Sequence, residues 1–341
     1  MTENLQRIGF LACVPGLLQE FGADPDEVLA AVGLVPEALN NPENTVSYPT
    51  MGRLLEACVA HTGCSHFGLL VGDRAGALSL GLIGALMAHA PTLGVAMRDL
   101  VLHQHRHARG AVVYLLDQQD AVLFGYAIYQ SDIAGAAQIY DGAVAMACSI
   151  IRRAIGRDHA DELTVLLSRS EPPDVHAYRR CLGSKVQFDS EFSGVLLPRA
   201  LMTANVAGAD PVERKSLEAR VAGYWQVGDY DIVTRLRRAL ASGLLTGQIG
   251  GDEMADALGM PRRTMTRRLA DCDTTFQAVL DETRFELARQ LLGNTGLPIS
   301  QISLVLRYAD QSVLTRAFAR WSGIPPREWR GRSRGWPAEV A

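Results

Sequence analysis

The segment "GGDEMADALGMPRRTMTRRLADC", residues 250–272, restricts the fold more than any other part of the chain. Its pattern predicts one helix from about Asp252 to Leu258, a tight turn at Gly259 and Met260, and a second helix that starts at Pro261. Glycine readily takes the left-handed conformation that ends a helix, and proline is favoured at the first helical position. The segment is therefore predicted to form two short helices joined by a turn.

The two predicted helices have an apolar and a polar face. At helical spacing, the apolar side chains turn inward, and they are Met254, Ala255, Leu258, Met265 and Leu269. The second helix then exposes one face made of Arg262, Arg263, Thr266 and Arg267. This is the pattern of a helix-turn-helix unit, whose second helix fits the major groove of DNA. A helical bundle with charged surface helices is the alternative interpretation.

The pattern occurs a second time in "ISQISLVLRYADQSVLTRAFARWSG", residues 299–323. We predict a helix from about Ile299 to Leu306, a turn through Tyr308 and Ala309, and a helix from about Gln311 to Trp321. Between the two copies, "TTFQAVLDETRFELARQLLGN" has helical periodicity and is predicted to be a rigid spacer. A plain bundle explains one charged helix but not two units with matching turns.

Charge is distributed unevenly along the chain. Residues 230–334 contain 16 arginines, no lysine and 11 acidic residues, a charge of +5, while the whole chain carries −4 and the remainder therefore −9. A basic domain joined to an acidic one is expected when only one of them meets a polyanion.

The first two-thirds of the chain predict a mixed α and β domain. Helical patterns fill the first hundred residues, and two β-branched and aromatic runs then predict a hairpin from about Ala111 to Tyr129. A long helix is expected at about Asp132–Ile155, followed by strands near residues 162–167, 186–188 and 194–197. We predict an α+β regulatory domain over residues 1–208, a helical connector over 209–228, an all-α domain with two helix-turn-helix units over 229–334, and a tail over 335–341.

The predicted all-α domain resembles the DNA-binding domain of AraC-type transcription regulators. The resemblance rests on the paired units, on "FQAVLDETRFELARQLL" between them, and on the ending "RAFARWSGIPPREWR". More loosely, "VQFDSEFSGVLLPRALM", the hairpin and the long helix resemble the arabinose-binding-like regulatory domain of one branch of that family. The resemblance implies that two recognition helices enter successive major-groove segments about 34 Å apart.

When the family's DNA contacts are carried over by position, the resemblance implies two sets of contact residues. They are Arg262, Arg263, Thr266 and Arg267 in the first helix-turn-helix unit, and Gln311, Ser312, Thr315 and Arg316 in the second. Arginine can read guanine, threonine can contact a thymine methyl group or a phosphate, and Arg262 and Arg268 are expected on phosphates or on the solvated flank. Arg307 stands where the family usually has glycine, so the second turn is expected to be strained or rebuilt.

The resemblance implies a sequence-specific regulator of transcription. We expect a homodimer that binds double-stranded promoter DNA, senses an unidentified small-molecule effector through its first domain, and activates transcription by contacting RNA polymerase. A repressor of the same architecture is the alternative. The residues fix neither the effector nor the direction of regulation.

Other classes of protein are less well supported. We find no catalytic motif, no cofactor site and no membrane span or signal peptide, so we expect a cytoplasmic protein without enzymatic activity. The six cysteines are expected to be free thiols. Two rival hypotheses remain: a cysteine nucleophile at Cys58 or Cys148, and a metal site formed by His103, His105 and His107, for which no fourth ligand stands at a recognisable spacing.

Overall fold

The computed structural model describes residues 5–104, 108, 110–118, 120–128, 133–183, 185–190, 192–225, 231–294 and 297–333. Contacts divide the chain into two compact units: the first holds most of residues 1–222, and the second holds residues 223–341 together with the short pieces 114–116 and 128–131. The first unit contains strands and helices and the second is helical, which confirms the predicted fold class.

The first unit begins with short helices whose ends follow from local sequence. Its first elements are β1 (Leu5–Arg7), α1 (Val14–Glu20), α2 (Pro25–Ala31), β2 (Thr45–Ser47), α3 (Tyr48–Thr62), α4 (Phe67–Ala75), α5 (Leu82–Ala88) and α6 (Leu93–His103). The Asp24 carboxylate accepts a hydrogen bond from the Asp26 N–H and caps α2. The Ser47 hydroxyl oxygen caps α3, which ends at Gly63 with a φ of 68°. These are the start and stop signals of helices.

A five-stranded sheet forms the second layer. It has the order β3 (Ala111–Asp117), β4 (Ala121–Ile128), β7 (Ser193–Pro198), β5 (Thr164–Leu166) and β6 (Val186–Gln187). β7 pairs antiparallel with β4 and β5, whereas β5 and β6 are parallel. The predicted hairpin and later strands are confirmed in their described residues; Tyr129 lies outside them. The antiparallel pair β1–β2 was not predicted, because three-residue strands are too short to show a period.

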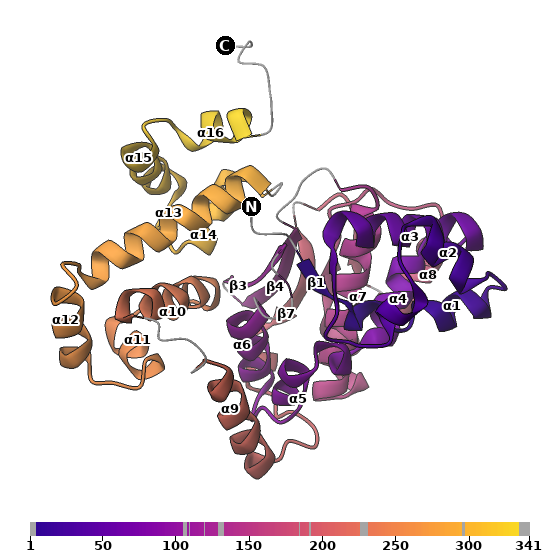
Figure 1. The fold of residues 1–341 in the computed structure, drawn as a ribbon, viewed down its shortest axis with the longest axis horizontal. Coiled ribbons are helices and arrows are strands. Elements are labelled where there is room, and N and C mark those ends of the chain that lie inside the picture. Colours follow the sequence, from indigo (N-terminus) through magenta and orange to yellow (C-terminus); the bar gives the residue numbers. More distant parts are fainter. Residues whose placement is uncertain are drawn as a thin grey trace. The chain divides into compact units, whose positions relative to one another are not determined.

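The long helix α7 (Ala136–Ile155) joins the sheet to the helical layer, and the predicted start at Asp132 lies outside the described residues. It packs against β7 on one side and against α4 on the other (Figure 1). Gly68 and Gly72 of α4 approach α7 so closely that an added Cβ would collide with the backbone carbonyls of Gln138 and Gly142. The Gln138 side chain fixes this contact, since its Oε1 accepts from the Gly68 N–H at 2.8 Å.

Two further helices complete the first unit, α8 (Val175–Leu182) and α9 (Pro211–Trp225), together with 3-10 turns at Ile8–Leu11, Pro36–Leu39, Ala77–Leu80, Arg157–Glu162 and Arg199–Thr203. α9 is bound to the unit by polar contacts. Arg214 donates to the two carboxylate oxygens of Asp99 at 2.8 and 3.3 Å and to the Leu86 carbonyl at 3.2 Å. The start of the predicted connector is therefore held by α5 and α6.

The second unit consists of seven helices in its described residues: α10 (Ile232–Thr246), α11 (Gly251–Ala257), α12 (Arg262–Ala270), α13 (Phe276–Asn294), α14 (Ile299–Val305), α15 (Gln311–Ser322) and α16 (Pro326–Ser333). α13 is the predicted spacer, and it runs from the α11–α12 pair to the α14–α15 pair (Figure 1). Aromatic side chains hold the middle of α13, where the Phe285 ring centroid lies 5.3 Å from that of Phe318 and 5.4 Å from that of Trp321.

Among the described residues, no single helix combines the length and the apolar character needed to cross a membrane. Helices α3 and α4 have that length and apolar character only when they are counted as one segment, and the two helices meet at a bend of 115°.

Candidate nucleic-acid interface

The first helix-turn-helix unit has the predicted turn. Gly259 has a φ of 68°, and its N–H donates to the Asp256 carbonyl at 2.9 Å. The Met260 N–H donates to the Ala255 carbonyl at 3.1 Å, which completes the usual C-terminal closure of a helix. Pro261 occupies the N-cap position and makes no side-chain cap, so α12 begins one residue later than predicted, at Arg262.

The two faces of this unit are confirmed. The five predicted apolar side chains are buried, including Met265 and Leu269, which are each 1% exposed. Arg262, Arg263, Thr266 and Arg267 are all exposed, as is Arg268 beside them. Arg262 pairs with Asp252 at 3.0 Å, and the Thr266 hydroxyl donates to the Arg262 carbonyl at 3.0 Å. In the described part of the chain, Arg263, Arg267 and Arg268 have no ion-pair partner, so their guanidinium groups remain available to an external anion.

The second helix-turn-helix unit, α14 and α15, has the same turn although Arg307 stands in it. Arg307 has a φ of 58°, and its N–H donates to the Leu304 carbonyl at 3.0 Å. The Tyr308 N–H donates to the Ser303 carbonyl at 2.9 Å, as in the first unit. Of the two expected outcomes, a strained turn or a rebuilt one, the turn is not rebuilt. A left-handed arginine still costs about 1 kcal/mol in backbone conformation, so other contacts must offset that cost.

The Arg307 side chain supplies such a contact. Its Nε donates to the Leu244 carbonyl at 3.1 Å, one of the carbonyls that the end of α10 leaves without an intrahelical partner. Arg284 of α13 supports the same turn, because it donates to the Leu306 and Arg307 carbonyls at 3.1 and 3.3 Å. Its guanidinium carbon also lies 4.7 Å from the centre of the Tyr308 ring. Charged donors on carbonyls at a helix end are favourable.

Arginine side chains also donate to carbonyls at or near other helix ends in the second compact unit. Arg235 of α10 donates to the Leu258 carbonyl at 3.0 Å, where α11 ends. Arg330 of α16 donates to the carbonyls of Leu292 and Leu297 at 3.2 and 2.5 Å. A share of the arginine excess thus stabilises the fold, and only the exposed arginines are candidates for DNA contact.

The second recognition helix is less basic than the first, with two arginines in α15 and four in α12. Gln311, Ser312 and Arg316 are exposed on α15, and Thr315 is half-buried with its hydroxyl donating to the Gln311 carbonyl at 2.8 Å. Asp310 caps this helix, since its carboxylate accepts from the N–H groups of Ser312 and Val313 at 2.7 and 3.0 Å. These hydrogen bonds, led by the one from Val313, hold the pKa of Asp310 below its usual value. The sequence prediction did not include this cap, although an aspartate before a helix is its usual signal.

The rival hypotheses gain no support from the described residues. Burial raises the pKa of the Cys58 and Cys148 thiols to about 12, so these thiols stay protonated and are poor nucleophiles. His103 ends α6, while His105 and His107 lie outside the described residues. The described ranges contain no group of three histidine, cysteine or acidic side chains placed to hold a metal ion.

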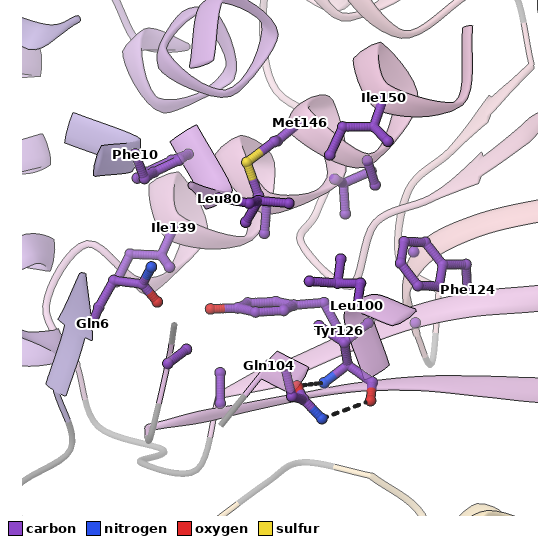
Figure 2. A pocket seen from close by; sticks show the side chains of 18 of the residues that line it. Gln6, Phe10, Leu80, Leu100, Gln104, Phe124, Tyr126, Ile139, Met146 and Ile150 are labelled. Carbon is purple, nitrogen blue, oxygen red and sulfur yellow. Dashed lines mark hydrogen bonds between the residues drawn. The ribbon is translucent and has the colours of Figure 1, made fainter. Parts of the chain in front are cut away.

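The first compact unit contains a cavity. It has a volume of about 70 Å³ and lies between α6, β4 and α7 (Figure 2). Its polar lining residues are Gln6, Gln104 and Tyr126. No sequence motif marks these three residues, because they belong to separate segments that only the fold brings together.

Comparisons with known proteins agree with this architecture. The model of the arabinose-binding domain of AraC transcription regulators matches residues 22–206, more than half of the chain, and a helix-turn-helix domain model matches residues 254–332. The regulator VirS of Mycobacterium tuberculosis is 28% identical over 92% of this chain and 93% of its own length. The ornithine utilization regulator of Pseudomonas aeruginosa is 27% identical over 96% and 97% of the two chains.

A solved structure, that of the transcriptional regulator CdpR from Pseudomonas aeruginosa, matches with a TM-score of 0.41 and 22% identity over 92% of this chain and 97% of that one. Together, the domain matches and the geometry of the two helix-turn-helix units establish the family. The chain belongs to the AraC family of DNA-binding transcription regulators, with an N-terminal arabinose-binding domain and a C-terminal helix-turn-helix domain.

Proposed function

We propose that this regulator binds promoter DNA as a homodimer through α12 and α15 and activates transcription when its first domain binds a small metabolite. The observation that carries the proposal is the pair of helix-turn-helix units with buried apolar faces and exposed polar recognition faces. Contact with RNA polymerase is the proposed route to activation.

The proposed DNA contacts differ in kind between residues. Arg263 and Arg267 are assigned to base edges, where a bidentate contact to guanine contributes about 1–3 kcal/mol of discrimination. Arg262 and Arg268 are assigned to phosphates. The hydroxyls of Thr266 and Thr315 are engaged with their own helices, so their methyl groups are the better candidates for contact with thymine. Gln311, Ser312 and Arg316 provide the polar contacts of the second helix.

The two recognition helices are proposed to contribute differently to affinity. Pro261 offers no capping side chain to the first N–H groups of α12, and four arginines follow or lie close by. An open helix N-terminus attracts phosphate. The first N–H groups of α15 are already occupied by the Asp310 carboxylate. The first helix-turn-helix unit is therefore expected to supply most of the attraction to the DNA backbone. The second helix-turn-helix unit is expected to supply mainly sequence discrimination.

The route from effector to DNA is proposed to pass along α6. Leu100 of this helix and Gln104, which directly follows it, line the cavity, while Asp99 of the same helix holds Arg214 of α9. The Asp99 side chain is 9% exposed and that of Arg214 15% exposed. A displacement of α6 by a bound molecule would alter this ion pair. α9 is thus the proposed element whose arrangement shifts with effector binding.

Footprinting of the purified full chain on DNA upstream of its own and neighbouring genes, across a salt series, tests the proposal. We expect protection of two adjacent major-groove segments on one face of the duplex, with affinity that falls as salt rises. An absence of specific protection at low salt, with and without cell extract, would refute it.

Transcription from a protected promoter with purified RNA polymerase tests the direction of regulation. A rise in transcript with added regulator supports activation. A fall supports the alternative, a repressor of the same architecture.

A further inference from the structure

The cavity of the first unit is built from parts of the chain far apart in sequence. Phe124 and Tyr126 of β4 form one wall, Ile139, Met146 and Ile150 of α7 form another, and further lining residues come from α6 and β1. Figure 2 shows the Tyr126 ring between these walls, with its hydroxyl group directed toward Gln6. The site lies wholly within the first unit.

The lining of this cavity contains no acidic, basic or histidine side chain among its described residues. Transfer of an unpaired charge out of water costs several kcal/mol, so a bound carboxylate or ammonium group would need an opposite charge that these described lining residues do not supply. A sugar would bring several hydroxyl groups, and each would need a hydrogen-bond partner.

The polar groups of the lining are largely engaged with the protein itself. Gln104 uses both ends of its amide on the backbone of Val113, which it accepts from at 2.5 Å and donates to at 3.1 Å. Gln6 accepts from the Tyr48 hydroxyl at 2.9 Å and donates to the Arg7 carbonyl at 3.2 Å. The Tyr126 hydroxyl lies 3.1 Å from that of Tyr48.

The Tyr126 hydroxyl remains a neutral hydrogen-bonding group, because burial raises its pKa well above the usual value. A hydroxyl has one donor and two acceptor positions, so a single contact to Tyr48 leaves capacity for a ligand.

We propose that this cavity binds a small, neutral and mostly apolar molecule whose single hydrogen-bonding group meets Tyr126, and not a sugar. This inference rests on the proposed sensing function of the first domain. A cavity of about 70 Å³ is about half the size of the 150 Å³ cavity that holds benzene, so the ligand is either a few carbons long or displaces flexible side chains. Met51 and Met146 line the cavity and have the flexibility for this movement.

Calorimetric titration of the full chain with four probes tests the chemical class. The probes are 1-butanol, 1-hexanol, hexanoate and L-arabinose at pH 7. We expect at least one alcohol to bind, hexanoate to bind at least tenfold more weakly than hexanol, and arabinose to show no binding. The inference is overturned if neither alcohol binds, or if hexanoate or arabinose binds as tightly as the alcohols.

A matched pair of variants tests the location. Ala147→Leu adds three carbons to the cavity wall on α7, whereas Ala60→Leu makes the same change on the exposed surface of α3. Alcohol binding should weaken at least tenfold in the first variant and stay unchanged in the second. Ala143→Leu, which fills the same cavity, replaces Ala147→Leu if circular dichroism shows that variant to be unfolded. Unchanged binding in a folded cavity variant would place the ligand elsewhere and refute the assignment.

DNA binding in the presence of each probe separates this inference from the proposed function. If an alcohol binds the cavity but leaves promoter affinity and transcription unchanged, effector control fails and the ligand class stands. If arabinose binds and changes promoter affinity, effector control stands and the ligand class fails.

Discussion

At the scale of single residues, arginine has two different roles in the second domain. Arg235, Arg284, Arg307 and Arg330 donate to backbone carbonyls, at or near helix ends for most of them, whereas the arginines of α12 point away from the core. Composition and net charge count both groups alike. The exposed group is therefore the one in which substitution should change DNA binding more than stability.

Arg267→Ala tests this division at the proposed recognition face. Loss of a base contact should lower affinity for the cognate site by about 1–3 kcal/mol and relax the preference at one base pair. Affinity for a set of single-base operator variants measures both effects. Arg268→Ala is the matched control, and it should weaken all sequences alike and reduce the salt slope by about one. A uniform loss in Arg267→Ala would make Arg267 a phosphate contact instead.

Substitution of Arg307 tests the second role of arginine, which is to stabilise the fold by donating to backbone carbonyls. Arg307→Ala keeps the left-handed conformation unfavourable and removes the donor to Leu244, so we expect the free energy of unfolding to fall by about 1–3 kcal/mol. Arg307→Gly also loses the donor but removes the backbone cost, so it should be about 1 kcal/mol more stable than the alanine variant. Urea unfolding of both variants measures the difference. Equal stability of the two would show that this turn carries no conformational cost.

Asp310 gives the second recognition helix a dependence on pH. Its folded-state pKa lies below the usual value of 3.8, so its stabilising contribution is present above pH 3.8 and is lost as the pH falls through the lower, folded-state pKa. Asp310→Ala should therefore be less stable than the parent protein at pH 7, and the difference should shrink in strong acid. Unfolding of both proteins by urea between pH 7 and pH 2 provides the test, and a difference that grows with acidity would contradict the capping role.

At the scale of helices and strands, the sequence predicted what is periodic and local. The faces of α12 follow from residues within one or two turns of each other, so spacing alone predicted that Arg263 and Arg267 are exposed, whereas Arg316 was assigned through the family resemblance. The cavity could not be predicted in this way, because its lining runs from Gln6 to Gly194 and depends on how the elements pack. The same holds for the Asp99–Arg214 pair, whose two residues show no pattern until α6 and α9 meet.

This ion pair should determine how firmly α9 is held. Asp99→Asn leaves Arg214 in contact with the Leu86 carbonyl and Glu218. We therefore expect the free energy of unfolding to fall by about 1–3 kcal/mol, which is less than the full cost of an isolated buried charge. Amide hydrogen exchange over Pro211–Trp225 should accelerate. Glu20→Gln breaks the exposed Arg74–Glu20 pair and serves as the control, with little expected effect. Unchanged exchange in α9 would remove the proposed route from α6 to the DNA-binding domain.

At the scale of the whole molecule, the charge division and the two-unit structure make a joint prediction. Deletion of residues 1–208 should leave a monomeric fragment that still protects its site, because both helix-turn-helix units and their core lie within the second unit. Specific affinity should fall, since a monomer binds one half-site. Non-specific affinity at low salt should rise instead, because deletion removes most of the acidic remainder while residues 230–334 carry +5. Footprinting and sedimentation of the fragment across a salt series separate these effects. A fragment that binds no DNA at any salt would mean that the first domain is needed to assemble the interface, and that the two domains do not work as sensor and reader.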